Sequence, residues 1–205
     1  MDYEVMMNGN VKIGQFAPDF EATTTMGTVK LSDYKGKWVI LFSHPGDFTP
    51  VCTTEMIALS KANNEFEARN ACLLGLSVDS NSSHLAWVFD IYCRTGVRIP
   101  FPIIADRNGI IARKYGMISS SVSNSETVRN VYIIDDKGII RAILIYPMTI
   151  GRCIPEILRI LEAAQTVDKC GGATPANWTL NRTYDSANTT NYEWVRGKSE
   201  RNWKK

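Results

Sequence analysis

One cysteine of this chain, Cys52, lies in a setting that favours a nucleophilic thiol. It comes after the apolar run 39–42 and just before the segment 54–69, whose apolar residues have mostly helical spacing. We therefore expect Cys52 in the first turn of a helix, at the end of a buried strand. Unpaired backbone N–H groups and the positive end of the helix dipole stabilise an anion there. The position favours the thiolate, which is the reactive form of cysteine.

Two neighbours of Cys52 are expected to shape a pocket around its sulfur. Thr49, three residues earlier, would lie on the same side of a helical turn, where its hydroxyl can donate and accept hydrogen bonds near the sulfur. Pro45 has a fixed φ and no N–H, so it would form a pocket wall and shield the thiolate from bulk water. Together these residues predict a small anionic pocket that suits a substrate with two oxygens.

The other cysteines and the histidine in the second predicted helix carry weaker signals. The five cysteines form an odd set without C-x-x-C spacing, which is typical of neither a disulfide framework nor a zinc ribbon. Cys72, Cys93 and Cys153 are interpreted as buried small hydrophobic residues, whereas Cys170, beside two glycines, stays open. We expect His84 on the surface of a helix. A zinc site from Cys72, His84 and Cys93 is disfavoured because no two of them form a short chelating pair, so no metal site is predicted.

The elements that must position Cys52 alternate between strand-like and helix-like segments through the first 165 residues. This order favours an α/β sheet with helices packed on its faces. Asp135-Asp136-Lys137-Gly138 is expected to form a hairpin turn, with glycine supplying the positive φ. Strands are expected at 39–42, 73–78, 103–104, 131–134 and 139–145, and helices at 54–69, 82–92 and 155–167.

The composition changes after the last predicted helix. The remaining segment is poor in aliphatic residues and too sparse in apolar residues to form its own core. We therefore predict one domain over residues 1–168 and a C-terminal extension or arm over residues 169–205, whose aromatic side chains pack on this subunit or on a partner. These aromatic residues are Trp178, Tyr184, Tyr192, Trp194 and Trp203.

Charge and hydropathy limit the classes of partner. The formal net charge is +2, and its Lys and Arg are dispersed, which disfavours nucleic-acid binding. No run approaches the roughly 20 apolar residues that span a bilayer, so no membrane association is predicted. The first four residues, Met1 to Glu4, are acidic and lack the apolar core of a signal peptide. A cytoplasmic location is therefore expected.

The segment around Cys52 resembles the active-site signature of peroxiredoxins, the AhpC/TSA family. The pattern is Pro45-x-x-x-Thr49-x-x-Cys52, and the wider string 44–55 looks like the one-cysteine subfamily. The similarity also includes segments 14–20, 100–106 and 146–152, so it covers about residues 10–178. The 27 residues that follow Trp178 are fewer than the subfamily usually has in its C-terminal domain.

This resemblance implies a fold and a set of site residues. The fold would be thioredoxin-like, with a central mixed β-sheet flanked by helices and a short C-terminal tail. Cys52 would be the peroxidatic cysteine, and Thr49 and Pro45 would complete the motif. Arg129 matches the active-site arginine, whose fixed guanidinium would favour the thiolate and hold the peroxide oxygens. Supporting residues that hydrogen-bond around the site would be His44, Glu55 and Arg152.

The implied activity is that of an antioxidant, thiol-specific peroxidase. The sulfur of Cys52 would attack one oxygen of hydrogen peroxide or of an organic hydroperoxide and become a sulfenic acid. The other oxygen would leave as water or an alcohol. No metal or other cofactor is implied. Implied partners are an external thiol reductant, of the thioredoxin, glutaredoxin or glutathione type, and a second copy in a homodimer or larger oligomer. Cys170, from the same subunit or a partner, is the alternative resolving thiol.

Three other functions are alternatives to the peroxidase. A thiol–disulfide oxidoreductase would want C-x-x-C, but position 49 is threonine. A cysteine phosphatase would want arginine six positions after its nucleophile, where the chain has Ala58. A non-enzymatic holdase or redox sensor would use exposed apolar surface and the oxidation state of Cys52. A peroxide-consumption assay discriminates it from the enzyme.

Overall fold

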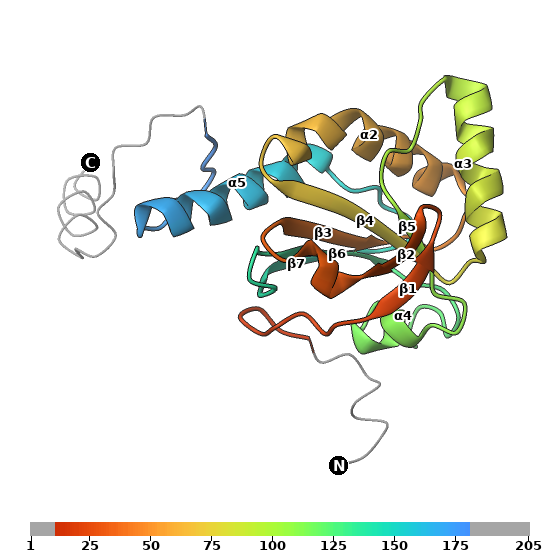
Figure 1. The fold of residues 1–205 in the computed structure, drawn as a ribbon, viewed down its shortest axis with the longest axis horizontal. Coiled ribbons are helices and arrows are strands. Elements are labelled where there is room, and N and C mark those ends of the chain that lie inside the picture. The colour runs from red at the N-terminus through yellow and green to blue at the C-terminus, as the bar shows by residue number, and fades with distance from the viewer. Residues whose placement is uncertain (1–10, 181–205) are drawn as a thin grey trace, which may run out of the picture. The chain divides into compact units, whose positions relative to one another are not determined.

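The computed structural model describes residues 11–180, and its centre is a mixed β-sheet (Figure 1). Within the described residues the sheet has seven strands in the order β2-β1-β5-β4-β3-β6-β7. The strands are β1 (Glu21–Thr24), β2 (Gly27–Lys30), β3 (Trp38–Ser43), β4 (Ala71–Ser77), β5 (Ile103–Ala105), β6 (Arg129–Ile134) and β7 (Ile140–Tyr146). The helices are η1 (Leu31–Tyr34), α2 (Pro50–Glu67), α3 (Asn81–Thr95), α4 (Ile110–Lys114) and α5 (Ile154–Cys170). The predicted α/β sheet with flanking helices is confirmed.

The predicted apolar run 39–42 forms most of β3, the strand that leads into the site. Every residue of β3 is buried, because the strand pairs in parallel with β4 and antiparallel with β6 and both of its faces are covered. The register pairs Phe42 with Val131, so the start of β6 lies at the edge of the sheet where β3 ends. Arg129, the first residue of β6, therefore lies near the beginning of α2.

The two faces of the sheet are covered by different helices. Val39 and Leu41 of β3 belong to a core cluster with Ile111 and Ala112 of α4. The connections β3–α2–β4 and β4–α3–β5 are successive parallel crossovers in one direction across the sheet, so right-handed connections bring α2 and α3 to the same face. Figure 1 shows α2 and α3 on one side of the sheet and α4 on the other.

The predicted hairpin between β6 and β7 is also confirmed. One carboxylate oxygen of Asp135 accepts hydrogen bonds from the backbone N–H groups of Lys137 (3.0 Å) and Ile139 (2.8 Å). Gly138 has a φ of 87°, a left-handed conformation that a residue without Cβ adopts at little cost. The turn residues identified in the sequence thus connect β6 to β7.

Within the described residues, those from 155 to 180 belong to a second compact part. Within it, Arg159 of α5 binds the Glu156 carboxylate at 2.6 and 2.7 Å and donates to the carbonyl oxygen of Trp178 at 3.3 Å. The segment after α5 therefore returns to the helix that precedes it. No helix in the described range 11–180 has the length and apolar character needed to span a membrane. The predicted aromatic residues Tyr184, Tyr192, Trp194 and Trp203 lie outside the described residues.

Candidate active site

Cys52 occupies the first turn of α2, as its sequence position predicts. Thr49 is the N-cap residue with extended backbone, and Pro50 is the first helical residue, where the missing N–H of proline costs no helical hydrogen bond. The sulfur-bearing side chain of Cys52 is 0% exposed. A thiolate at this position would face the unpaired N–H groups and the positive dipole end of an 18-residue helix.

Arg129 is the nearest cation to the sulfur among the contacts of the described residues. Its Nη1 lies 3.3 Å from Cys52 Sγ, and the residue is 2% exposed. The same Nη1 donates to Glu55 Oε2 at 2.7 Å, while Nε and Nη2 both donate to the Met148 carbonyl oxygen at 2.9 and 2.7 Å. Because each donor has a fixed partner, the guanidinium is held with one edge toward the sulfur.

Glu55 links the two buried arginines. It lies one helical turn after Cys52, and its Oε2 accepts from Arg129 and from Arg152 Nη2, both at 2.7 Å. Its Oε1 accepts from the backbone N–H of Arg152 at 2.8 Å and from Arg152 Nε at 2.9 Å. Burial raises the pKa of the Glu55 carboxyl, but the charge and hydrogen bonds of Arg152 and the charge of Arg129 outweigh it, so the net pKa is lowered. Glu55 is therefore ionised at neutral pH.

Arg152 ties the end of the sheet to this group. Its Nη1 donates to the carbonyl oxygens of Ser43, at 2.9 Å, and of Asn130, at 3.1 Å. Its guanidinium carbon lies 5.1 Å from the centroid of the Phe42 ring, in the range of a cation–π contact. The side chain thus fixes the end of β3 relative to β6 and to α2.

The charges of this buried group balance only when Cys52 is a thiolate. Arg129 and Arg152 carry two positive charges and Glu55 carries one negative charge, and their side chains are at most 4% exposed. One positive charge is left without a buried counter-ion among these three side chains. Burial makes such an excess charge costly, and deprotonation of Cys52, 3.3 Å from Arg129, would remove it.

The motif residues before Cys52 lie in the loop between β3 and α2. Pro45 is buried. The hydroxyl of Thr49 donates to the Gly46 carbonyl oxygen at 2.9 Å, so its hydrogen is used within the loop and its lone pairs are left to accept. Phe48 has a φ of 57° and is 55% exposed, and such left-handed backbone in a non-glycine residue is strained.

His44 contacts Asp47 and Trp87. Its Nε2 bonds to Asp47 Oδ1 at 3.0 Å, and its ring lies 5.1 Å from that of Trp87. Trp87 in turn donates to the hydroxyl of Thr53 at 3.2 Å, next to Cys52. His44 is therefore joined to the first turn of α2 through an aromatic neighbour.

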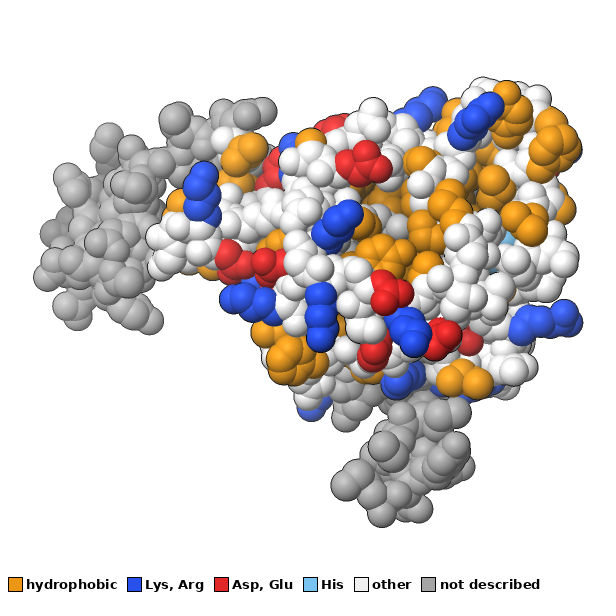
Figure 2. Space-filling model, viewed as in Figure 1, with side chains coloured by type: hydrophobic (Ala, Val, Ile, Leu, Met, Phe, Trp, Pro, Cys, Tyr) orange, Lys and Arg blue, Asp and Glu red, His pale blue; other side chains and the backbone are white. Residues whose placement is uncertain are grey.

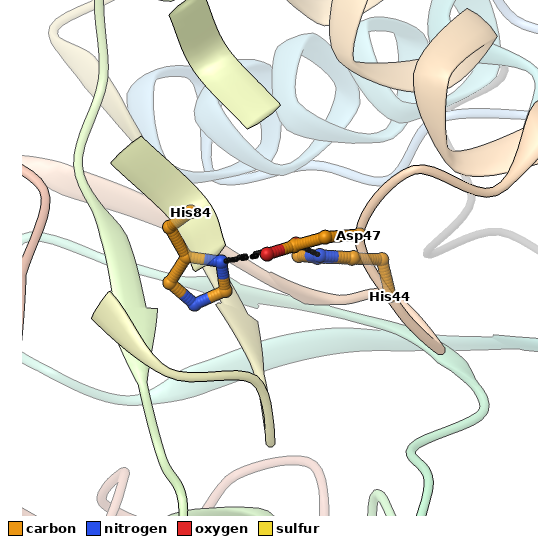
Figure 3. A group of neighbouring side chains, drawn as sticks. All are labelled: His44, Asp47 and His84. Carbon is orange, nitrogen blue, oxygen red and sulfur yellow. Dashed lines mark hydrogen bonds and ion pairs between the residues drawn. The ribbon is translucent and has the colours of Figure 1, made fainter. Parts of the chain in front are cut away.

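The expectation that His84 lies on the surface is wrong. His84 is 0% exposed, because α3 buries the face that carries His84, Trp87 and Ile91, at helical spacing. His44, Asp47 and His84 also form a group whose nitrogen and carboxylate atoms all lie within 4.8 Å of one another (Figure 3), close enough to be considered for a metal ion. Their contacts of 2.9–3.0 Å are, however, ordinary hydrogen-bond lengths.

Two of the cysteines interpreted as buried are exposed. Cys93 and Cys153 are both exposed, whereas Cys72 is partly buried. Cys93 follows the outward-facing Tyr92 on α3, and Cys153 lies in the loop before α5, so neither position faces a core. Cys170 is exposed and is the last residue of α5, a turn longer than the helix predicted from the sequence.

Comparisons with known proteins agree on one family. The sequence model of the AhpC/TSA family matches residues 13–143. Peroxiredoxin 2 of Caldanaerobacter subterraneus subsp. tengcongensis is 62% identical over 167 residues, which cover 82% of this chain and 76% of that protein. The peroxiredoxin of Aquifex aeolicus is 57% identical over 168 residues, with the same two coverages.

Solved structures give the same result for the fold. A yeast mitochondrial 1-Cys peroxiredoxin superposes with a TM-score of 0.77 at 41% identity, covering 84% of each chain. A mutant of peroxiredoxin 6 of Arenicola marina superposes with a TM-score of 0.79 at 34% identity, covering 91% of this chain and 89% of that one. The sheet and helices around Cys52 are thus those of a thioredoxin-like fold, as predicted.

Proposed function

Because the chain belongs to the AhpC/TSA family of peroxiredoxins and is a thiol-dependent peroxidase, we propose that Cys52 is its peroxidatic cysteine. The observation that carries this proposal is the position of Cys52 Sγ in the first turn of α2, 3.3 Å from Arg129 Nη1. The buried arginine pair adds an excess positive charge that the thiolate neutralises. A helix terminus and a fixed guanidinium are the features that turn a cysteine into a nucleophile.

The proposed reaction uses these groups in order. The Cys52 thiolate attacks the terminal oxygen of a hydroperoxide, the O–O bond breaks, and the electron pair leaves on the second oxygen as alkoxide or hydroxide. That oxygen takes a proton to become alcohol or water, and Cys52 becomes a sulfenic acid. Arg129 would hold the peroxide oxygens and stabilise the charge that develops on them. The chemistry needs no metal or other cofactor.

Thr49 and Pro45 complete the proposed site. Since the Thr49 hydroxyl donates its hydrogen to Gly46 at 2.9 Å, it can meet the substrate as an acceptor for the O–H of the hydroperoxide. Buried Pro45 offers no competing N–H to the pocket. His44, Glu55 and Arg152 would act as supporting residues, with Glu55 and Arg152 fixing Arg129 and the end of β3.

An external thiol is the reductant that we propose for the sulfenic acid. The solved yeast relative is described as using the glutathione and thioredoxin systems for thiol resolution, and reductants of the thioredoxin, glutaredoxin or glutathione type have the same chemistry. The five cysteines of this chain are all free among the described contacts, which fits a reducing compartment and supports a cytoplasmic location.

A second copy of the chain is the proposed protein partner, in a homodimer or a larger oligomer. Apolar side chains are exposed on and near α3, and Figure 2 shows side chains of this type gathered over that helix. They include Leu85 (49% exposed), Phe89 (67%) and Phe48 (55%). Exposed apolar surface of this kind is typical of an interface. Residues 169–205 remain the proposed extension or arm of a domain over 1–168.

The test of the proposed site is Cys52→Ser, which replaces the sulfur with almost no change in volume. We expect it to abolish thiol-dependent peroxide consumption while leaving the fold intact, because only the nucleophile is lost. The matched control is Cys93→Ser, an exposed cysteine on α3, which should consume peroxide at the wild-type rate. Near wild-type turnover by Cys52→Ser would show that another group carries the reaction.

A further inference from the structure

A second pocket of the described residues lies where β3 begins, at the edge of the sheet opposite the one where β3 leads to Cys52. It has a volume of about 220 Å³ and is lined by residues of three segments, 16–19, 31–39 and 134–138. Its lining includes Val39, four positions before Ser43 at the end of β3. Since a strand rises about 3.3 Å per residue, these two positions are roughly 13 Å apart along the strand. A ligand in this pocket would therefore not compete with peroxide for Cys52.

Backbone hydrogen bonds hold the three segments together. The N–H of Ala17 donates to the carbonyl oxygen of Gly138 at 2.8 Å, and the N–H of Gly36 donates to the carbonyl oxygen of Asp136 at 2.9 Å. The first and the second segment are thus both fixed to the turn between β6 and β7. The walls of the pocket are formed before a ligand arrives, so binding would order little additional chain.

Much of the lining is apolar or aromatic. Leu31, Val39 and Ile134 are buried, Tyr34 is half-buried, and Phe16 is 73% exposed. Phe16 therefore presents a large apolar ring to water although it borders a cavity, and a ligand that covers this ring gains free energy from the burial. The volume is below the roughly 300–1,000 Å³ of pockets for drug-sized ligands. The pocket thus suits a molecule of one or two rings.

Three lysines give the pocket positive charge. Lys35, Lys37 and Lys137 line it and are exposed, and among residues 11–180 their ammonium groups form no hydrogen bond or ion pair. Within the same range the hydroxyl of Tyr34 also has no hydrogen-bond partner. Burial raises the pKa of Tyr34, so the hydroxyl keeps its hydrogen at neutral pH and can donate it to an anion.

The two acidic residues of the lining already have other partners. One carboxylate oxygen of Asp19 accepts from the backbone N–H groups of Phe20 and Ser32, both at 3.0 Å. Asp135 accepts from backbone N–H groups of the turn, and its other oxygen lies 3.2 Å from Arg141 Nη1. A negatively charged ligand would therefore meet the lysines without displacing an ion pair that the described residues form.

We propose that this pocket, the lysine pocket, binds a small aromatic carboxylate. The ring of the ligand packs against Phe16 and Tyr34, and its carboxylate pairs with the ammonium groups of Lys35, Lys37 and Lys137. The apolar lining alone would accept any ring and the lysines alone any anion, so together they select a molecule that has both. The inference does not depend on the role of Cys52.

The probe is 2-naphthoate, titrated into the full chain by isothermal titration calorimetry. We expect it to bind at one site per chain. Neutral 2-naphthylmethanol should bind at least about fivefold more weakly, because one contact between exposed charges is worth up to about fivefold in affinity. Octanoate, an anion without a ring, should also bind more weakly. Added sodium chloride should weaken the binding of 2-naphthoate, because salt screens exposed charges. Absence of 2-naphthoate binding, or an equal affinity for either of the other compounds, would overturn the proposal.

Charge variants locate the site. The double variant Lys37→Gln/Lys137→Gln should bind 2-naphthoate roughly three- to tenfold more weakly and bind the neutral alcohol as the wild type does. The matched control Lys61→Gln/Lys169→Gln removes two exposed lysines that do not line the pocket, and it should bind 2-naphthoate like the wild type. Equal losses in the two double variants would show that net charge, and not the lysine pocket, attracts the probe.

Phe16→Ala tests the ring contact and should weaken 2-naphthoate binding by roughly two- to tenfold, the usual effect of a lost aromatic pair. Its control is Phe89→Ala, which removes another exposed phenylalanine, on α3 (67% exposed). A loss in Phe89→Ala without one in Phe16→Ala would place the probe on α3 and disprove the proposal. Should Phe16→Ala fail to fold, the lysine variants still decide. Cys52→Ser should bind 2-naphthoate like the wild type, so a failed assignment of Cys52 would be recognised separately.

Discussion

At the scale of single residues, the reactivity of Cys52 depends on which side chains share its buried surroundings. An arginine suits the position of Arg129 better than a lysine would, because its planar fork can hold Glu55 and Met148 and still direct a nitrogen toward the sulfur. Glu55 separates the two guanidinium groups, which would otherwise repel each other. Arg129, Arg152 and Glu55 therefore fix a positive charge beside the thiol, and both arginines share Glu55 as their ion-pair partner.

Replacing Arg129 tests this charge. In Arg129→Met the thiolate loses its nearest cation, so we expect the midpoint of the pH dependence of Cys52 alkylation to move upward. The rate of reaction with hydrogen peroxide should fall by at least about tenfold, as for the loss of a transition-state donor. Arg129→Lys keeps the charge without the fork and should shift the midpoint less than Met does. Identical midpoints for Arg129→Met and wild type would rule out the proposed role.

Thr49 is tested by removing one oxygen. Thr49→Val keeps the shape of the side chain but has no hydroxyl, so we expect the second-order rate constant for peroxide, measured by stopped flow, to fall by one or more orders of magnitude, roughly the effect of a lost transition-state hydrogen bond. Thr49→Ser retains the hydroxyl and should stay near the wild-type rate. Equal losses in both variants would indicate that the methyl group, and not the oxygen, matters.

At the scale of elements, the site depends on how β3 and β4 pack beneath it. Gly75 of β4 faces β3, and a Cβ at this position would lie 3.2 Å from Phe42 Cζ and 3.5 Å from Ile103 Cγ1. The Phe42 ring also lies beneath the Arg152 guanidinium. A side chain at position 75 would therefore push on the ring that supports the arginine.

Gly75→Val tests this coupling between the sheet and the site. The extra volume has to displace Phe42, so we expect a loss of unfolding free energy of about 1–3 kcal/mol, the usual cost of overpacking, together with a lower peroxidase rate. Urea unfolding and the peroxide assay measure the two effects. The control Gly172→Ala adds a methyl group where no atom lies within 4 Å and should change stability by less than about 0.5 kcal/mol. Unchanged stability of Gly75→Val would contradict the packing argument.

The strong local patterns of the sequence predicted the elements that carry Cys52. The apolar run of β3, the turn after β6 and the helical spacing of α2 each follow from side-chain alternation or turn chemistry, and each appears in the structure. Boundaries were less accurate. Helix α2 begins at Pro50 and not at residue 54, because proline and the N-cap residue begin the helix before its apolar periodicity is evident.

The polar interior could not be predicted in the same way. The residue type alone does not tell whether a histidine in an amphipathic helix is buried or on the surface. His84 can be buried because Asp47 and the carbonyl oxygen of Ile104 provide hydrogen-bond partners for both of its ring nitrogens. The helical spacing of His84, Trp87 and Ile91 was the feature of the sequence that could have indicated that His84 is buried. Glu55 is paired with Arg152 in the loop before α5, 97 positions away, and with Arg129 at the start of β6, 74 positions away. Such long-range ion pairs leave no local pattern.

At the scale of the whole molecule, the open chemical step is the removal of the sulfenic acid. The sequence suggested Cys170 as an internal resolving thiol because two glycines follow it. The structure instead places Cys170 in the last turn of α5, where the next residue, Gly171, donates to the Val167 carbonyl oxygen at 2.9 Å. The backbone at Cys170 is therefore held by helical hydrogen bonds, and an internal bridge would have to break them.

The last prediction is that an external thiol, and not Cys170, resolves Cys52. A disulfide needs the two α-carbons within about 7 Å. Cys52 is fully buried and Cys170 is exposed at a helix end, so the backbone would have to rearrange before the two sulfur atoms could bond. We treat the protein with one equivalent of hydrogen peroxide in the absence of added thiol and map disulfides by mass spectrometry, with Cys170→Ser and Cys153→Ser as controls. We expect Cys52 as sulfenic acid in all three proteins, and full turnover by Cys170→Ser once a small thiol is added. A dominant Cys52–Cys170 peptide that disappears in Cys170→Ser would show that Cys170 resolves the sulfenic acid. The helical hydrogen bonds at the end of α5 would then have to break when the disulfide forms.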